Sequence, residues 1–176
     1  MNRQMMLAPH QEQLPDLAAA SIGELLVRRL RAAPDRIAVA RVARPGRRSN
    51  RVAGIERWTW VELTAAALRL ADALEGAGLR QGDRVAHLGP HSVDWIVADL
   101  ACLLAGLVHA PLHAGGSARE NLGQLEWLAP RGVITSGGPT PLPRVVLRGK
   151  PVVAAEQAWQ EPLAGPPGPI LAALER

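Results

Sequence analysis

The chain of 176 residues carries a formal net charge of +4, and 48% of its residues are hydrophobic while 20% are charged. This composition excludes an intrinsically disordered chain and is typical of one globular domain with a core of its own. The single cysteine, Cys102, excludes a framework of internal disulfides, and the longest apolar stretch, 96–111, is shorter than the roughly 20 residues of a membrane-spanning helix.

Residues 1–20 are expected to form an N-terminal extension. They hold no sustained apolar core with a cleavage site behind it, so we predict no secretory signal and expect a cytoplasmic protein. A helix is predicted over residues 21–33. Its apolar residues recur at helical spacing, at Ile22, Leu25, Leu26 and Leu30.

A basic loop, residues 41–51, follows between two strand-like runs at 37–42 and 55–58, which together predict a hairpin. The loop has no acidic residue and contains Arg41, Arg44, Arg47, Arg48 and Arg51. One interpretation is an anionic partner such as nucleic acid or a lipid surface. However, no aromatic residue stands among the arginines to stack on bases, and a Pro-Gly pair suits a hairpin tip. We therefore expect a solvated loop and no nucleic-acid partner.

Three helices are predicted to begin with the same signature, a hydroxyl residue followed three positions later by Glu. In this capping box the hydroxyl and the carboxylate each accept a hydrogen bond from a free amide of the first turn. The pairs are Ser21 with Glu24, Thr59 with Glu62, and Ser117 with Glu120. They predict helices at 21–33, 60–77 and 117–129, and Gly78 suits a left-handed cap after the second.

A fourth helix is predicted from Ser92 to about Ala105, apolar on more than one side and therefore buried. The β-like runs at 84–88, 108–112 and 133–135 alternate with these helices. This alternation predicts an α/β fold, with βαβ units around a mainly parallel sheet. The domain at 21–136 is followed by a Pro- and Gly-rich tail, 137–176, whose runs at 145–147 and 152–155 are candidate edge strands.

The segment ITSGGPTPLPR, residues 134–144, is a candidate nucleotide-binding loop because Thr135, Ser136 and Gly137 are residues that wrap phosphates. Such loops grip phosphate through successive backbone N–H groups. Prolines at 139, 141 and 143 remove three of these donors. We therefore expect the end of a strand, and we assign no cofactor-binding residues.

Two histidine pairs, His87 with His91 and His109 with His113, straddle the ends of two predicted parallel strands, where such sheets tend to bind ligands. Zinc is one alternative. Ordinary strand-end histidines are the other, and we prefer it because a proline interrupts each interval, so no metal ligand is assigned. No catalytic set is predicted either from the remaining candidates, Cys102, Ser92, Ser117, Asp94, Asp99, Glu120 and Glu126.

Several blocks, in order and at matching spacing, resemble the opening of an adenylate-forming enzyme of the AMP-dependent synthetase and ligase family. They are AAPDRIAVA at 32–40, RWTWVEL at 57–63 and GLRQGDRVAHLGPHSVDWIVADLACLLAGLVHAPLH at 78–113. The resemblance covers residues 21–136 and implies the first portion of the family's N-terminal domain. PLH, residues 111–113, is similar to the long-chain fatty acyl-CoA branch.

The resemblance implies chemistry that lies further along the family's chain. There a phosphate loop ending in Lys, an aromatic-Gly-x-Thr-Glu motif, a ribose-binding Asp and a C-terminal Lys bind ATP and Mg²⁺, form an acyl adenylate and acylate coenzyme A. We therefore expect an acyl-CoA synthetase-like segment that is truncated, is not catalytic alone and needs no cofactor by itself. The alternatives are a non-catalytic interaction module or half of a split enzyme, or an unrelated activity on the same scaffold. An exposed apolar patch is expected to cause self-association or to bind the missing half.

Overall fold

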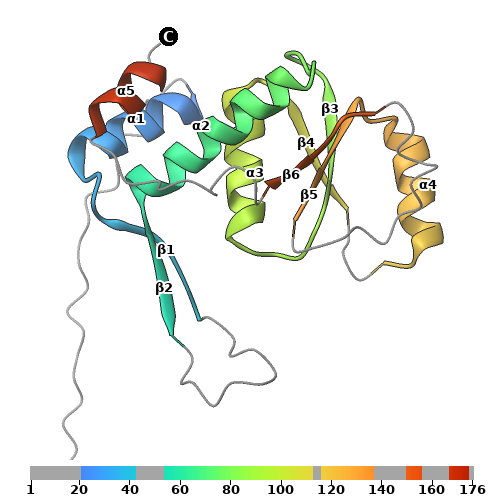
Figure 1. The fold of residues 1–176 in the computed structure, drawn as a ribbon, viewed down its shortest axis with the longest axis horizontal. Coiled ribbons are helices and arrows are strands. Elements are labelled where there is room, and N and C mark those ends of the chain that lie inside the picture. The colour runs from blue at the N-terminus through green and yellow to red at the C-terminus, as the bar shows by residue number, and fades with distance from the viewer. Residues whose placement is uncertain (1–20, 43–53, 113–115, 137–149, 156–166, 175–176) are drawn as a thin grey trace, which may run out of the picture.

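The computed structural model describes residues 21–42, 54–112, 116–136, 150–155 and 167–174, and they form a hairpin and a four-stranded sheet with helices around them (Figure 1). The helices are α1 (Ile22–Ala32), α2 (Trp60–Gly76), α3 (Val93–Leu104), α4 (Ala118–Leu128) and α5 (Pro167–Leu174). The strands are β1 (Ile37–Val42), β2 (Ile55–Thr59), β3 (Arg84–Leu88), β4 (Val108–Leu112), β5 (Gly132–Thr135) and β6 (Val152–Ala154).

The four-stranded sheet is parallel throughout, in the order β4-β3-β5-β6. Helix α3 connects β3 to β4 and lies on one face with α2, whereas α4 connects β4 to β5 and lies on the other face (Figure 1). Helices on both faces are what parallel strands require, because the crossovers must return over the sheet. The predicted α/β fold with βαβ units is confirmed.

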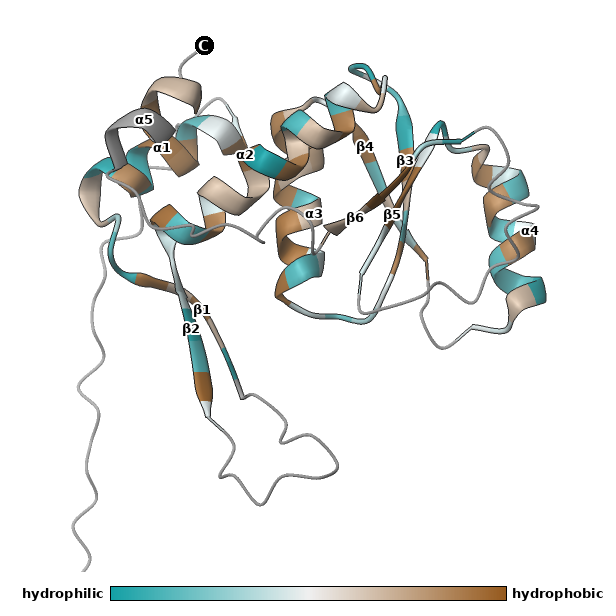
Figure 2. Ribbon diagram, in the orientation of Figure 1, coloured by the Kyte–Doolittle hydropathy of each residue, from teal (hydrophilic) through white to brown (hydrophobic). Residues whose placement is uncertain are grey.

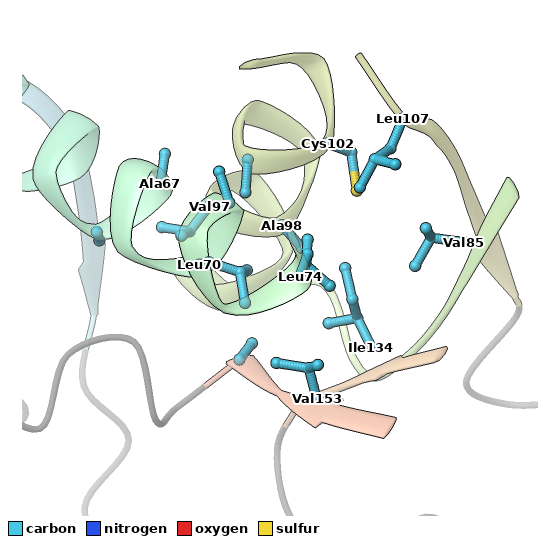
Figure 3. Close-up of a cluster of buried hydrophobic side chains, with 14 of the residues drawn as sticks. Ala67, Leu70, Leu74, Val85, Val97, Ala98, Cys102, Leu107, Ile134 and Val153 are labelled. Atoms are coloured by element: carbon cyan, nitrogen blue, oxygen red, sulfur yellow. The ribbon is translucent and has the colours of Figure 1, made fainter. Parts of the chain in front are cut away.

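The alternation of side chains along the strands divides the core in two. We call the larger part the α2–α3 core; in it Leu70 and Leu74 of α2 and Val97 of α3 pack over Val85 and Ile134 of the sheet (Figure 3). The smaller part, the α4 core, contains Ala86, Leu88, Leu112, Val133 and Leu125. The predicted burial of the fourth helix is confirmed, since Val97, Ala98, Ala101 and Cys102 have no exposed surface.

The tail contributes to this sheet. Strand β6 pairs in parallel with β5 at the edge, which confirms one of the two candidate edge strands, while residues 145–147 lie outside the described residues. Val153 and Ala155 enter the α2–α3 core, and α5 packs against α1 and α2. The tail therefore covers part of the surface of the domain.

The predicted hairpin is confirmed: β1 and β2 pair antiparallel, with Val42 opposite Ile55. Arg41 forms an ion pair with Glu56 across the strands, with 2.5 Å between Nε and Oε2. The other four arginines of the basic loop lie outside the described residues.

Pro111 lies inside β4, where it is level with His87 of β3, and the predicted strand at 108–112 is confirmed with the proline in it. Proline lacks an N–H, so it is tolerated in a strand whose other edge is unpaired. Strand β4 is such an edge strand among the described residues.

The three predicted capping boxes form to different extents. Thr59 and Ser117 each form the complete box with Glu62 and Glu120. At Ser21 only half of the box forms, because the hydroxyl accepts from the amide of Glu24 whereas the Glu24 carboxylate forms an ion pair with Arg28 at 2.6 Å. A neighbouring arginine one turn away competes successfully for this carboxylate.

The fourth helix begins where predicted, but the side chain of Ser92 does not cap it. Ser92 occupies the N-cap position of α3, but its hydroxyl donates to Oδ2 of Asp94 at 3.0 Å and makes no capping bond. Gly78 has a φ of +90°, which confirms the predicted left-handed residue after α2. None of the helices in the described part of the chain is long and apolar enough to cross a membrane.

Candidate functional site

A chain of hydrogen bonds joins four polar side chains on the α3 face of the sheet, from Ser136 just after β5 to His109 near the start of β4; we call it the His87–His109 relay. Nε2 of His87 lies 2.9 Å from Oγ of Ser136, and Nδ1 of His87 lies 3.2 Å from Nε2 of His109. Nδ1 of His109 lies 2.9 Å from Oδ1 of Asp99. The relay thus connects β3, β4, α3 and the residue after β5.

The pleat of the sheet explains why these residues meet. His87 and His109 lie on the same face of adjacent strands, one diagonal step apart, since His109 is level with Val85 and Pro111 with His87. Ser136 points to that face as well, because its neighbour Thr135 continues the alternation on β5. Helix α3 crosses this face and supplies Asp99.

A close approach of two backbone segments fixes Ser136. Its amide donates to the carbonyl of Leu88 at 3.0 Å. Gly89 lies so close that a Cβ there would stand 1.9 Å from Oγ of Ser136 and 2.8 Å from its carbonyl oxygen. Only glycine leaves room for this hydroxyl, so the residue that follows β3 is part of the site.

The relay is buried at one end and open at the other. Ser136 is 4% exposed and His87 is 1% exposed, whereas the side chain of Asp99 is 42% exposed. Burial, together with the nearby His109, lowers the pKa of His87 from 6.5 to about 4, although the Asp99 carboxylate opposes this shift. His87 is therefore neutral near neutral pH, with one ring nitrogen donating and the other accepting.

The aromatic and sulfur groups around the relay carry no nucleophile. The ring of Trp95 stands edge-on to His109 at 5.6 Å between centroids, and the ring of His91 lies 5.5 Å from that of Trp95. Burial, with the Asp99 carboxylate as a second cause, raises the pKa of Cys102 to about 12, so its thiol stays protonated. It packs as a small apolar side chain of α3.

The structure separates the histidines that the sequence placed in pairs. His87 contacts His109 of the other pair, whereas His91 is exposed and contacts Trp95; His113 lies outside the described residues. Their nitrogens point along a chain and do not converge on one point. Among the described residues, no group of three or more His, Cys, Asp or Glu side chains is arranged to hold a metal ion.

The other candidate residues have structural positions. Thr135 is the last residue of β5, which confirms that ITSGG begins as the end of a strand, while residues 137–149 lie outside the described residues. Ser117 and Glu120 cap α4, and Ser92 and Asp94 bond to each other at the start of α3. Glu126 lies exposed on α4.

Every member of the relay is a candidate residue in the sequence, but nothing in the sequence alone connects the four. The alternation of side chains along the strands could have placed His87 and His109 on one face, since both occupy odd-numbered positions of β3 and β4. To place Asp99 on that face as well, one must know how α3 is rotated about its axis. Helical periodicity is weak there, because α3 is hydrophobic over most of its length (Figure 2).

Comparison with known families matches residues 26–166 to the family described as AMP-binding enzyme. The acetyl-coenzyme A synthetase of Phycomyces blakesleeanus is 39% identical over 82 residues, which are 47% of this chain and 12% of that protein. The feruloyl-CoA synthase of an Amycolatopsis species is 46% identical over 55 residues, which are 31% of this chain and 11% of that protein. The chain thus matches about a tenth of the length of these relatives.

Solved structures share the fold. O-succinylbenzoate coenzyme A synthetase from Bacillus subtilis, in complex with ATP and magnesium, superimposes with a TM-score of 0.60 at 24% identity, over 78% of this chain and 34% of that one. The N-terminal subdomain of NpsA from Klebsiella oxytoca gives 0.60 at 20% identity, over 80% of this chain and 31% of that one. At these identities the likeness shows a common fold.

Proposed function

The chain belongs to the family of AMP-binding enzymes, and from that premise we propose that it is the N-terminal segment of an acyl- or aryl-CoA synthetase. The observation that carries the proposal is the match over 26–166 together with curated relatives that are coenzyme A ligases. In this proposal the complete enzyme activates a carboxylic acid with ATP and passes the acyl group to coenzyme A. Two observations suggest different acids as the substrate. The relatives suggest acetate or ferulate. PLH at 111–113 suggests a long-chain fatty acid.

The described residues do not fit ATP and Mg²⁺ by themselves. A phosphate loop needs free hydroxyl and amide donors. The amide and the hydroxyl of Ser136 are both engaged inside the protein, with Leu88 and His87. We therefore propose that the segment is not catalytic alone, and we derive no step through the nucleotide.

The segment would contribute scaffold and one wall of the site. In parallel α/β sheets ligands bind outside the carboxyl ends of the strands. The Ser136–His87 end of the relay lies at that edge, so in this proposal it is the part nearest to an active site completed by other segments. The proposed partner for the chain alone is a second copy or the remainder of the enzyme. Apolar side chains left exposed on several elements favour it, namely Leu103, Val108, Trp127 and Val152.

A chimaera tests the proposal. The 82-residue region of the Phycomyces acetyl-coenzyme A synthetase that aligns with this chain is replaced by the chain's own residues. We expect the chimaera to keep acetate-dependent exchange of pyrophosphate into ATP, while the chain alone shows none. Ferulate and a long-chain fatty acid are assayed beside acetate. A Leu70→Asp chimaera, whose core is disrupted, is the matched negative control. A folded chimaera without exchange would refute the assignment.

A further inference from the structure

Two arginines stand opposite each other at the amino edge of the parallel sheet. Val85 of β3 is level with Gly132 of β5, so Arg84 and Arg131, one residue earlier in each segment, are level as well. The amide of Arg131 donates to the carbonyl of Arg84 at 2.7 Å, which confirms that the register continues to this point. Neighbouring strands lie about 4.8 Å apart, so the two side chains leave the sheet close to each other.

A lysine extends this pair to three cations, which we call the Arg84–Arg131–Lys150 row. Val133 of β5 is level with Val152 of β6, so Lys150, two residues before Val152, is level with Arg131. The residues two positions further along β3 and β5 lie in the α4 core, and those on the other face do not. Because side chains alternate along a strand, the row points to the face that α4 covers.

The row lines an open hollow of about 810 Å³ between the turn that follows α2 and the turn that follows α4. This volume lies within the range of about 300–1,000 Å³ that is usual for small-molecule sites. Among the described residues that line the hollow, Asp83 is the one acidic residue, and its Oδ2 accepts from the amide of Arg80 at 2.9 Å. The charge of the lining is therefore positive.

The charges of the row are not balanced inside the protein. Within the described part of the chain, the exposed guanidinium groups of Arg84 and Arg131 form no ion pair. Like charges directly opposite each other on neighbouring strands are destabilising. Lys150 donates to the carbonyl of Pro130 at 2.6 Å, which leaves two of its three N–H groups for a ligand. An anion held between the three side chains would remove the repulsion.

The helix ends beside the hollow would repel an anion only if their carbonyl groups were free, because these groups carry partial negative charge. After α2, the guanidinium of Arg80 donates to the carbonyls of Glu75 and Leu79 at 3.0 and 2.7 Å. After α4, Lys150 occupies the carbonyl of Pro130. These carbonyls are therefore bonded within the protein, and the arginines of the row keep their donors for a ligand.

We propose that the Arg84–Arg131–Lys150 row binds a small ligand that carries two or more linked phosphate groups. A guanidinium matches two phosphate oxygens at once, and an ammonium adds a compact charge. The row spans two strand separations, about 10 Å, which suits a chain of phosphates better than a single one. The proposal does not rest on the acyl-CoA synthetase assignment, since the row lies at the amino edge of the sheet and Ser136 at the carboxyl edge.

Calorimetric titration of the whole chain with sodium tripolyphosphate, at fixed ionic strength, measures this binding. We expect one saturable site, and Arg84→Gln and Arg131→Gln should each weaken it at least about tenfold, because each removes charge-assisted hydrogen bonds. Arg57→Gln, at an exposed position of β2 beside the basic loop, removes the same charge and should change the affinity less than about twofold. Equal weakening by all three substitutions would overturn the site, and so would inorganic phosphate that binds as tightly as tripolyphosphate.

NMR of the unsubstituted chain locates the ligand without relying on a variant. Tripolyphosphate should shift the backbone amide signals of Arg84, Arg131 and Lys150 and leave that of Arg57 unchanged. Without ligand, Arg131→Gln should unfold at a urea concentration no lower than the unsubstituted chain, since it removes the repulsion from Arg84. Unshifted signals of the row at saturating tripolyphosphate would refute the proposal, and a lower urea midpoint beside them would mean that the arginines serve only the fold.

Discussion

The two faces of the parallel sheet are covered in different ways. On one face α3 and α2 build a core in which seventeen of the described residues are buried; on the other face α4 covers a cluster of five. Helix α3 is hydrophobic over most of its length, whereas α4 alternates apolar and polar residues (Figure 2). The first helix is therefore held by packing on two sides, and the second by one apolar stripe and its own cap.

The two faces of the sheet also differ in the polar side chains that they bury. The polar relay lies under α3, on the face with the larger core, where it is shielded from water on most sides. The α4 face holds buried Thr135 and Asn121. Among the described residues, Oδ1 of Asn121 on α4 has no hydrogen-bond partner, and neither do Nε1 of Trp60 and Oγ1 of Thr64 on α2. The relay is therefore a local feature beneath α3, where packed surroundings keep its geometry, and not a general property of the α2–α3 face.

The largest effect should come from truncating a leucine in the larger core. Leu70 of α2 has no exposed surface, so Leu70→Ala should lower the free energy of unfolding by about 4 kcal/mol. Leu125→Ala, on the α4 face, should cost about 2 kcal/mol, because the smaller cluster lies near the surface and can close over the cavity. Urea unfolding of both variants measures the two losses in the free energy of unfolding. Equal losses would mean that the two faces support the fold equally.

Acid should weaken the α3 face specifically. The pKa of His87 is lowered to about 4 in the folded chain but is near 6.5 when the chain is unfolded. Between these values the unfolded chain binds a proton that the folded chain does not, so stability falls as the pH drops from 6.5 to 4, by roughly 3 kcal/mol. Above pH 6.5 this contribution is fully present.

The comparison that isolates this effect is urea unfolding of the unsubstituted chain and His87→Gln at pH 7 and pH 4.5. Glutamine keeps a polar atom near Ser136 but does not titrate in this range. Carboxylates titrate in both proteins, so the difference between their pH dependences reports His87. Identical dependences would contradict the assigned burial effect.

The fold was predictable from the sequence because its signals are local. Capping pairs marked the starts of α2 and α4, and the strand bounds at 84–88 and 108–112 followed from short apolar runs between helices. The glycine before Val133 joined β5 in the structure because strand pairing with Val85 extends one residue beyond the apolar run. Ser92 failed as a capping side chain because Asp94, two residues on, competes for its hydroxyl.

The relay was not predictable because its contacts are not local. His87 and Ser136 are 49 positions apart, and His87 and His109 are 22 positions apart. Only the strand order β4-β3-β5 brings them together, and that order places β5 beside β3 and not beside β4. The sequence indicates that helices and strands alternate, but it does not state on which side of β3 the third strand is added.

The side chain at the N-cap position should contribute more to stability in α4 than in α3. Ser117 forms a complete capping box, so Ser117→Ala should cost about 1 kcal/mol. Ser92 makes no capping bond, so Ser92→Ala should cost less than about 0.5 kcal/mol. Thr59→Ala, at the second complete box, serves as the positive control at about 1 kcal/mol. Equal losses at Ser92 and Ser117 would show that α3 also depends on its N-cap residue.

The smallest effect on stability is expected at the outer surface of α4. The side chain of Trp127 is 88% exposed, so Trp127→Gln removes almost no buried area and should change the free energy of unfolding by less than about 0.5 kcal/mol. A large exposed indole is nevertheless unfavourable in water, so Trp127 is a candidate contact for the proposed association. The substitution should therefore reduce association and leave folding unchanged.

Sedimentation of the chain at roughly tens of micromolar shows which face of the sheet mediates self-association. Leu103 of α3 is 44% exposed, so Leu103→Gln is the matched variant on the opposite face. If the unsubstituted chain self-associates and only Trp127→Gln restores a monomer, the contact uses the sparsely covered α4 face. If only Leu103→Gln does so, the contact uses the α3 face. A monomeric unsubstituted chain that binds no hydrophobic dye would mean that the domain exposes no associating surface, because an accessible apolar patch would bind such a dye.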